Sequence, residues 1–201
     1  MNFALIGKMR SGKDETAKLL SLFIPHVKIV AFGDMLKKQF HKEFPHIPKV
    51  PKPRNSEAFT PEQINQWKGK PIIGYQEYGQ MKRKENPDIW VNYLLEEIKR
   101  DQSKPYIVTD VRQMNEYNAL KQLGFYMVRV EANEEIRIGR MRRNGEVVTG
   151  LNHETERMVD HFDVDYVLDN NTNDPDILKK KVHEMVIFFQ HKSIVYVKES
   201  I

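Results

Sequence analysis

Short apolar runs alternate along the chain with longer segments in which apolar residues recur every three or four positions. The short runs are rich in Val, Ile and Tyr and predict strands at 2–6, 27–32, 106–109, 126–131 and 166–168. The longer segments predict helices at 13–23, 34–44, 87–100, 115–123, 134–143 and 175–191. Because strand and helix alternate over the whole chain, we expect a three-layer α/β/α fold around a five-stranded parallel sheet.

Two segments interrupt this alternation. Residues 45–53 contain four prolines, and the stretch from there to Gly74 predicts an irregular excursion with at most a short helix beginning near Thr60. Residues 144–152 are polar, contain glycine and directly follow a cluster of arginines. Long irregular segments inside a domain often close over a ligand, so both segments are candidate lids.

Composition narrows the class of protein. The 201 residues, 40% of them apolar, can bury one substantial core, so we expect a single domain over residues 1–201. The absence of cysteine excludes disulfides, thiolate metal sites and cysteine nucleophiles. The net charge of +4 suits an anionic partner, but acidic and basic residues are interspersed, which favours a small phosphorylated ligand over nucleic acid. With no apolar run of membrane-spanning length and no signal-peptide pattern, we expect a cytoplasmic protein without membrane contact, as a monomer or homodimer.

The segment between the first predicted strand and the first predicted helix carries the pattern Gly7-x4-Gly12-Lys13. In a phosphate-binding loop, or P-loop, glycines let backbone amides converge on an anion, and the following helix N-terminus adds partial positive charge. Lys13 then reaches the β- and γ-phosphates of ATP; a glycine-rich turn that only caps a helix is the alternative. The predicted ATP-binding residues are Gly7, Lys8, Arg10, Ser11, Gly12, Lys13, Asp14 and Glu15.

Two carboxylates are candidate ligands of Mg²⁺. Asp14 occupies the position at which P-loops usually carry a metal-binding hydroxyl, and a carboxylate is also a hard oxygen ligand. Asp110 ends the apolar run 106–109, as expected of an acid that holds the ion through water beside the loop. The alternatives are that Asp14 complements the helix dipole and that Asp110 caps the next helix.

Arginines supply the positive charge that a transferring phosphoryl group requires. Arg112 follows Asp110 by two residues and is expected in the same crevice. Arg137 and Arg140 share one face of a predicted helix that ends at the second candidate lid. The predicted catalytic residues are therefore Lys13, Arg112, Arg137 and Arg140, although an arginine-rich helix can also be a solvated charged face.

Three motifs together resemble a known family. The sequences GKMRSGKD at 7–14, AFGDMLK at 31–37 and DVRQMNE at 110–116 are similar to motifs of the P-loop deoxynucleoside monophosphate kinases of phages and bacteria. YQEYGQMKR at 75–83 and PDIWV at 87–91 extend the likeness over most of the chain. Gly33 stands where the family often has Ala, and Gln80 where it often has Thr. Animal-type phosphomevalonate kinases share this layout.

The resemblance implies a P-loop NTPase fold of the nucleoside monophosphate kinase type, with ATP and Mg²⁺ as cofactors and small nucleotides as substrates. It places an acceptor-binding excursion at about 45–85 and a lid at about 137–155, with Glu156 as a candidate to anchor the lid or position an arginine. The acceptor residues that it implies are Phe32, Asp34, Lys37, Gln76, Gly79, Arg83 and Trp90.

The expected reaction is transfer of the γ-phosphoryl of ATP to a (deoxy)nucleoside monophosphate, which gives ADP and the nucleoside diphosphate. A kinase of phosphomevalonate or another small phosphorylated acceptor is the first alternative, because it keeps the basic acceptor site and dispenses with base recognition. Gln76 and Trp90 favour a base. A nucleotide-binding regulatory module is the second alternative.

Overall fold

The computed structural model describes residues 1–45, 72–145, 148, 151 and 154–199. The proline-rich excursion and its possible short helix near Thr60 therefore lie outside the described residues, as does most of the candidate lid at 144–152. None of the helices in the described ranges is long and apolar enough to cross a membrane.

All five predicted strands are present in one parallel sheet. They are β1 (Phe3–Ile6), β2 (Lys28–Val30), β3 (Tyr106–Val111), β4 (Tyr126–Glu131) and β5 (Tyr166–Asp169). The strand order is β2-β3-β1-β4-β5, and every adjacent pair is parallel. The predicted second strand ran two residues too far, because Phe32 is the first residue of helix α2 rather than the last of a strand. The predicted α/β fold around a five-stranded parallel sheet is confirmed.

The helices agree with the predicted positions, with three additions. They are α1 (Lys13–Ser21), α2 (Phe32–Glu43), α4 (Ile72–Glu85), α5 (Ile89–Arg100), α6 (Met114–Gln122), α7 (Glu134–Arg143), α8 (Glu154–Met158), the 3₁₀ turn η1 (Val159–His161) and α9 (Pro175–Glu199). The sequence pattern does not predict α4, because two glycines and mixed polarity weaken its helical periodicity. It also missed the short α8 and η1, and it ended α9 at residue 191.

The chain divides into two compact units. One consists of residues 1–31 and 98–201 and contains the whole sheet; the other is residues 32–97, with α2, α4 and most of α5. The expectation of one domain that carries an acceptor-binding excursion stays a prediction.

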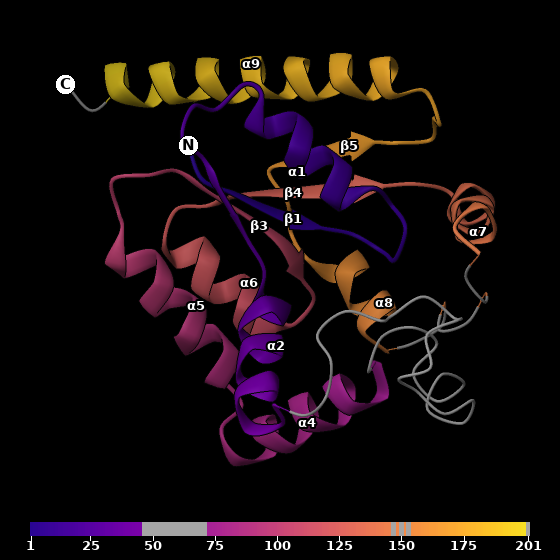
Figure 1. Ribbon diagram of the computed structural model, residues 1–201. Helices are drawn as coiled ribbons and strands as arrows, with labels where there is room; N and C mark the ends of the chain where they lie inside the picture. The colour runs from indigo at the N-terminus through magenta and orange to yellow at the C-terminus, as the bar shows by residue number, and fades with distance from the viewer. Residues whose placement is uncertain (46–71, 146–147, 149–150, 152–153, 200–201) are drawn as a thin grey trace. The chain divides into compact units, whose positions relative to one another are not determined.

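The sheet unit is layered, with α1 and α9 on one face of the sheet and α6 on the other (Figure 1). Strand β1 is buried along its full length because it lies in the middle of the sheet. Its side chains alternate, so that Phe3 and Leu5 join the core formed with α1 and α9. The ring of Phe189 from α9 is fully buried there, 5.3 Å from the ring of Phe3 and 4.3 Å from that of Tyr126.

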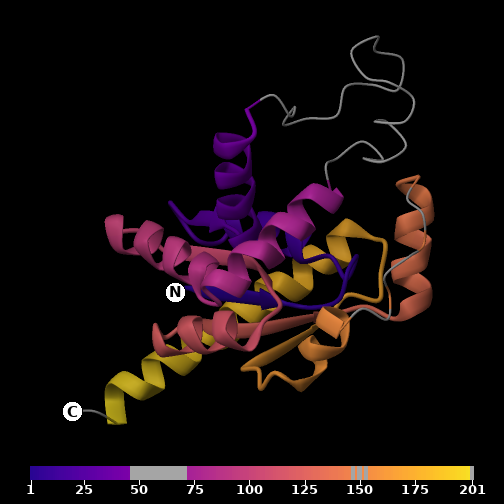
Figure 2. The same cartoon turned by 90° about the horizontal axis from the view of Figure 1, so that it is seen from below.

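In the view from below, α7 stands beyond the carboxyl end of β4 (Figure 2). The chain passes from β1 through α1 to β2, yet β1 pairs with β3 and β4. In open parallel sheets, ligands bind outside the carboxyl ends of the strands, at the point where the strand order reverses. The loop that follows β1 lies at this point.

The second unit has an aromatic core. Phe40 of α2 contacts Tyr75 and Tyr78 of α4 with ring centroids 5.0 and 5.5 Å apart. Trp90 is 1% exposed, and its ring centroid lies 6.1 Å from that of Tyr78. Gly79 lets α2 approach α4, because a Cβ at this position would stand 2.6 Å from the Leu36 side chain.

Adjacent phenylalanines of α9 test the sheet core. Phe189→Ala should lower the free energy of unfolding by about 3–5 kcal/mol, because it empties a buried ring site between α9 and β1. Phe188→Ala, at a ring that is 44% exposed, should cost less than about 1 kcal/mol. Urea denaturation measures both values, and equal losses would contradict the assigned core.

Candidate active site

The loop from Gly7 to Lys13 joins β1 to α1, and both of its glycines are required by geometry. Gly7 has φ +154°, and a Cβ there would stand 2.5 Å from the Val130 carbonyl oxygen. Gly12 has φ +104°, and a Cβ there would stand 2.2 Å from the side-chain nitrogen of Asn170. Both positive φ values and the close neighbours exclude a side chain, which explains the glycine spacing of the motif.

Lys13 folds back onto its own loop. Its Nζ donates to the carbonyl oxygens of Gly7 at 2.7 Å and Lys8 at 3.0 Å, so the ammonium is held inside the curve of the loop. Helix α1 begins at Lys13 without a side-chain cap. Its first turn therefore presents an uncapped positive dipole end next to this ammonium, an arrangement that binds anions.

Three side chains from distant segments bind the remaining carbonyls of the loop. Arg137 of α7 donates to the Met9 carbonyl at 3.4 Å. Arg140 of α7 donates to the carbonyls of Arg10 and Ser11, both at 3.0 Å, and Asn170, just after β5, donates to Ser11 at 2.7 Å. The Gly12 carbonyl accepts from the amide of Thr16. Every loop carbonyl from residue 7 to residue 12 thus has a donor.

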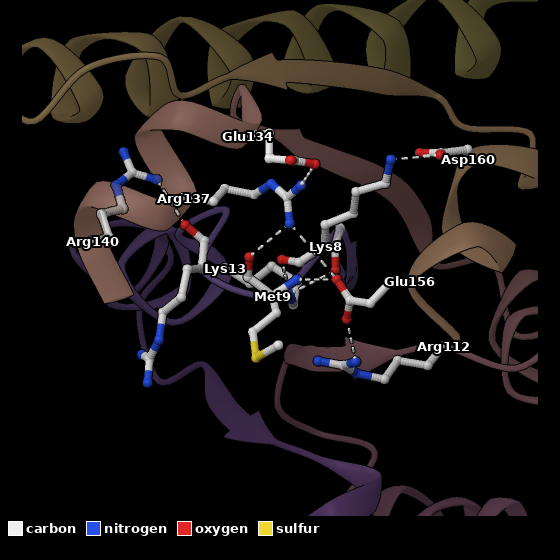
Figure 3. Close-up of polar contacts among 11 residues, drawn as sticks. Lys8, Met9, Lys13, Arg112, Glu134, Arg137, Arg140, Glu156 and Asp160 are labelled. Atoms are coloured by element: carbon white, nitrogen blue, oxygen red, sulfur yellow. Dashed lines mark hydrogen bonds and ion pairs between the residues drawn. The ribbon is translucent and has the colours of Figure 1, made fainter. Parts of the chain in front are cut away.

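Arg140 uses all five guanidinium donors on the protein. Besides the two loop carbonyls, it donates to the carbonyls of Asn170 at 2.9 Å and Thr172 at 2.6 Å, and to the Asn173 side chain at 3.4 Å. The sequence predicted that Arg137 and Arg140 point the same way, and both do point at the loop (Figure 3). In this conformation Arg140 crosslinks the loop to the segment after β5; its catalytic role stays a prediction.

Arg112 and the buried Glu156 lie on the other side of the loop (Figure 3). Arg112 Nη1 donates to Glu156 Oε1 at 2.7 Å, and the Met9 amide donates to Glu156 Oε2 at 2.6 Å. Arg137, which is 3% exposed, stands with Nη1 4.0 Å from Glu156 Oε2. The structure therefore brings all four predicted catalytic residues to the same loop. Lys13, Arg137 and Arg140 bind its carbonyls, and Arg112 reaches it through Glu156.

Burial and charge lower the pKa of Lys13. The pKa falls from 10.5 to about 8, first because burial disfavours the ammonium and then because Arg112 is nearby; Glu156, Asp14 and Asp110 act in the opposite direction. A lysine with such a pKa titrates close to neutral pH. A bound polyphosphate would stabilise the ammonium form and raise this pKa.

The two candidate metal ligands both act electrostatically on Lys13. Asp14 is exposed on the first turn of α1, Asp110 is half-buried near the end of β3, and both raise the pKa of Lys13, which places them within electrostatic reach. Among the described residues, no group of three or more His, Cys, Asp or Glu forms a complete metal site.

This donor set fits Mg²⁺, which proteins usually hold through one or two carboxylates together with substrate phosphates. The Oγ of Ser11 supports the fit, because it is buried within the loop and has no hydrogen-bond partner in the described part of the chain. Buried hydroxyls without partners are uncommon, and a phosphate oxygen or a metal-bound water would satisfy this one.

A pocket of about 580 Å³ opens beside the start of α1. It is lined by Arg10, Gly12, Lys13, Asp14, Glu15, Lys18, Arg140, Arg143, Asn144, Asn170, Thr172, Asn173, Asp174, Pro175 and Leu178. This volume falls in the range of small-ligand sites. Five of the predicted ATP-binding residues line it. Of the other three, Gly7 and the buried Ser11 lie within the loop, and Lys8 forms an ion pair with Asp160 at 2.7 Å.

The predicted acceptor residues all belong to the second unit, residues 32–97. Gly79 and Trp90 have packing roles there: Trp90 is buried and its indole nitrogen lies 3.5 Å from the Gly79 carbonyl. Phe32 is buried, whereas Asp34 and Lys37 form an exposed ion pair at 3.1 Å. Arg83 is half-buried on α4, and the side chain of Gln76 lies outside the described residues. Acceptor binding by this set stays a prediction.

The site residues predicted from the sequence do not include the segment after β5, residues 170–174. Asn170 and Asn173 bind the loop or its arginines, and both line the pocket. An asparagine cluster directly after the last strand was the available signal, because strand ends on this side of a parallel sheet face the ligand.

Comparison with protein-family models and with curated protein sequences gives no match. Among solved structures, the tunicamycin resistance protein of Deinococcus radiodurans matches with a TM-score of 0.54 at 14% identity, over 92% of this chain and 96% of that one. A shikimate kinase from Aquifex aeolicus gives a TM-score of 0.44 at 18% identity, over 96% and 99% of the two chains. A dephospho-CoA kinase from Campylobacter jejuni gives 0.47 at 13%, over 92% and 95%. The chain shares the α/β fold of the Deinococcus radiodurans protein, and the Gly-Lys loop at the strand-order reversal makes it a P-loop fold.

The lowered pKa of Lys13 predicts a pH-dependent nucleotide affinity. The ammonium form binds phosphate, so the affinity for a fluorescent ADP analogue should be nearly constant between about pH 7 and pH 8, where the phosphate is already ionised, and fall by up to about tenfold per unit above pH 8. The variant Lys13→Arg, which stays protonated, should show no such fall. Constant wild-type affinity up to pH 9.5 would contradict the assignment.

The five hydrogen bonds of Arg140 predict a stability difference from its neighbour Arg143, which donates at 2.6 Å to Asn173 and is exposed. Arg140→Lys removes the planar fork and should cost about 2 kcal/mol, which corresponds to a loss of roughly 4–8 °C in Tm. Arg143→Lys should lower Tm by less than about 2 °C. Calorimetry measures both, and equal Tm values would contradict the crosslinking role.

Proposed function

We propose that this protein transfers the γ-phosphoryl of ATP to a small phosphorylated acceptor, and that the acceptor is a (deoxy)nucleoside monophosphate. The observation that carries the proposal is the loop itself: its carbonyls are all bound by protein donors, and its lysine stands beside an uncapped helix N-terminus. The amides of Met9 and Ser11 donate to protein acceptors, so this arrangement assigns anion recognition to other loop amides, the helix end and Lys13.

On this proposal, ATP lies with its phosphates over the loop. Lys13 compensates charge on the β- and γ-phosphates, and Arg112 and Arg137 stabilise the charge that spreads over the transferring group. The 580 Å³ pocket between the start of α1 and the segment after β5 is large enough for the nucleoside of the donor. Asp14 and Asp110 would hold Mg²⁺, which supplies neutralisation of the phosphates when bound.

The reaction needs no protein nucleophile. A phosphate oxygen of the acceptor attacks the γ-phosphorus in line, the bond from that phosphorus to the β–γ bridging oxygen breaks, and ADP leaves with the electron pair. For the acceptor, the proposal rests on the sequence of the second unit, in which Lys37 and Arg83 supply positive charge and Gln76 an amide for a base. No mechanism step beyond positioning and charge stabilisation is required.

A panel of acceptors with ATP and Mg²⁺ tests the proposal. Deoxynucleoside and nucleoside monophosphates and phosphomevalonate are compared by ADP release and by identification of the product. We expect a nucleoside diphosphate as product, and Lys13→Met should lower turnover by about 100-fold or more, because the phosphate-binding charge is lost. Lys180→Met, at an exposed lysine of α9, is the matched control and should retain wild-type turnover.

Each other outcome has a defined meaning. If only phosphomevalonate gives a product, the proposed nucleotide acceptor is wrong and the proposed kinase activity stands. If the protein binds ATP but phosphorylates no acceptor, the proposed kinase activity is wrong, and a nucleotide-binding regulatory module is the remaining alternative.

A further inference from the structure

We propose that Glu156 is a positioning residue: its carboxylate fixes the guanidinium of Arg112 and the tip of the P-loop relative to each other, so that both meet the γ-phosphoryl group together. The inference rests on the proposed phosphoryl transfer, and it assigns the residue that sets the geometry of that site.

The two oxygens of the Glu156 carboxylate have separate partners. Oε1 accepts from Arg112 Nη1 at 2.7 Å, while Oε2 accepts from the Met9 amide at 2.6 Å and stands 4.0 Å from Arg137 Nη1 (Figure 3). The residue is 2% exposed, so solvent does not compete for these bonds. One carboxylate therefore joins α8 to the loop after β1 and to the residue after β3.

Arg112 is held at both ends by buried glutamates. Its backbone amide donates to Glu116 Oε2 at 2.9 Å, and its side chain donates to Glu156. Glu116, which is 3% exposed, also accepts the amide of Gln113 and forms the capping box of α6. Glu116 thus fixes where Arg112 leaves the sheet, and Glu156 fixes where its guanidinium points.

The charge balance supports this assignment. Lys13, Arg112 and Arg137 all approach the loop. Glu156 contacts both arginines, and Arg137 has a second ion pair with the exposed Glu134 at 3.5 Å. Without Glu156, Arg112 would lose its buried ion pair and the cations around the loop would repel one another more strongly, which turns a long arginine side chain toward water. A hydrogen-bonded carboxylate keeps them in place before the nucleotide arrives, which reduces the reorganisation needed for transfer.

The test compares Glu156→Gln with Asp160→Asn. Asp160 lies four residues further along and binds the side chain of Lys8 in the same loop, but this ion pair is half-exposed. Glu156→Gln removes the charge and leaves the side-chain shape. We expect kcat to fall about 100-fold with a change in the KM for ATP of less than about 5-fold, because misplacement of Arg112 acts mainly in the transition state. Asp160→Asn should change neither by more than about 2-fold.

A double-mutant cycle with Arg112→Gln separates positioning from independent action. If Glu156 acts through Arg112, the double variant should have the kcat of Arg112→Gln alone, within about 3-fold. This comparison also decides the question if Glu156→Gln does not fold, since the double variant removes both charges of the pair. A further large loss of kcat in the double variant would overturn the proposal.

Amide exchange of Met9, followed by NMR, gives a readout that needs no turnover. We expect exchange to accelerate by about tenfold or more in Glu156→Gln and to stay unchanged in Asp160→Asn. Unchanged exchange in Glu156→Gln would overturn the proposal even if the wild type transferred no phosphoryl group, whereas absent wild-type turnover with accelerated exchange would remove the proposed function alone. Tighter ATP binding with unchanged kcat would show that Glu156 only occupies the site of the γ-phosphate, and would also overturn it.

Discussion

The site depends on one constraint: the backbone amides of the P-loop must face the anion, while its backbone carbonyls face the opposite way and need hydrogen-bond donors of their own. An amide that receives an anion cannot also satisfy a carbonyl of the same loop. The Ser11 amide donates to the Lys8 carbonyl at 3.1 Å, but the other loop carbonyls need donors from side chains or from α1. Lys13 binds the carbonyls of Gly7 and Lys8, and the Thr16 amide binds that of Gly12. Arg137, Arg140 and Asn170 bind the carbonyls of residues 9–11 from segments about 130 to 160 positions away. The loop is therefore shaped by α7 and by the segment after β5 as much as by its own sequence.

The same contacts explain how the fold accommodates so much positive charge around the loop. Arg140 directs its donors to neutral carbonyls and a side-chain amide, where each hydrogen bond offsets lost hydration. For Lys13, burial of the ammonium remains energetically unfavourable, and this lowers its pKa. Such a poorly stabilised cation at the centre of a site favours the arrival of a polyphosphate, since the anion relieves an unfavourable charge that the fold has created.

The sheet unit and the unit of residues 32–97 differ in how their polar residues are used. In the sheet unit, buried polar side chains converge on the loop and leave a pocket beside it. In the second unit, residues expected to recognise an acceptor include several that pack its aromatic core: Trp90 and Gly79 hold α4 close to α5 and α2. Aromatic and small residues suit a ligand site and a packed core equally well. Only the contacts that such a residue makes in the folded structure show which of the two roles it has.

The sequence by itself determined the alternation of strands and helices, the Gly7-x4-Gly12-Lys13 loop between the first of each, and the arginines near it, because periodicity and glycine spacing are local properties. It failed at α4 and α8, where glycine or shortness weakens the helical pattern, and at Phe32, whose apolar side chain suits a strand end and a helix start equally. Only the tertiary structure decided that Arg140 crosslinks the loop, that Asn170 excludes a side chain at Gly12, and that Glu156 joins Arg112 to Met9. These pairings connect residues 44 to 159 positions apart, and no local pattern encodes which distant donor reaches which carbonyl.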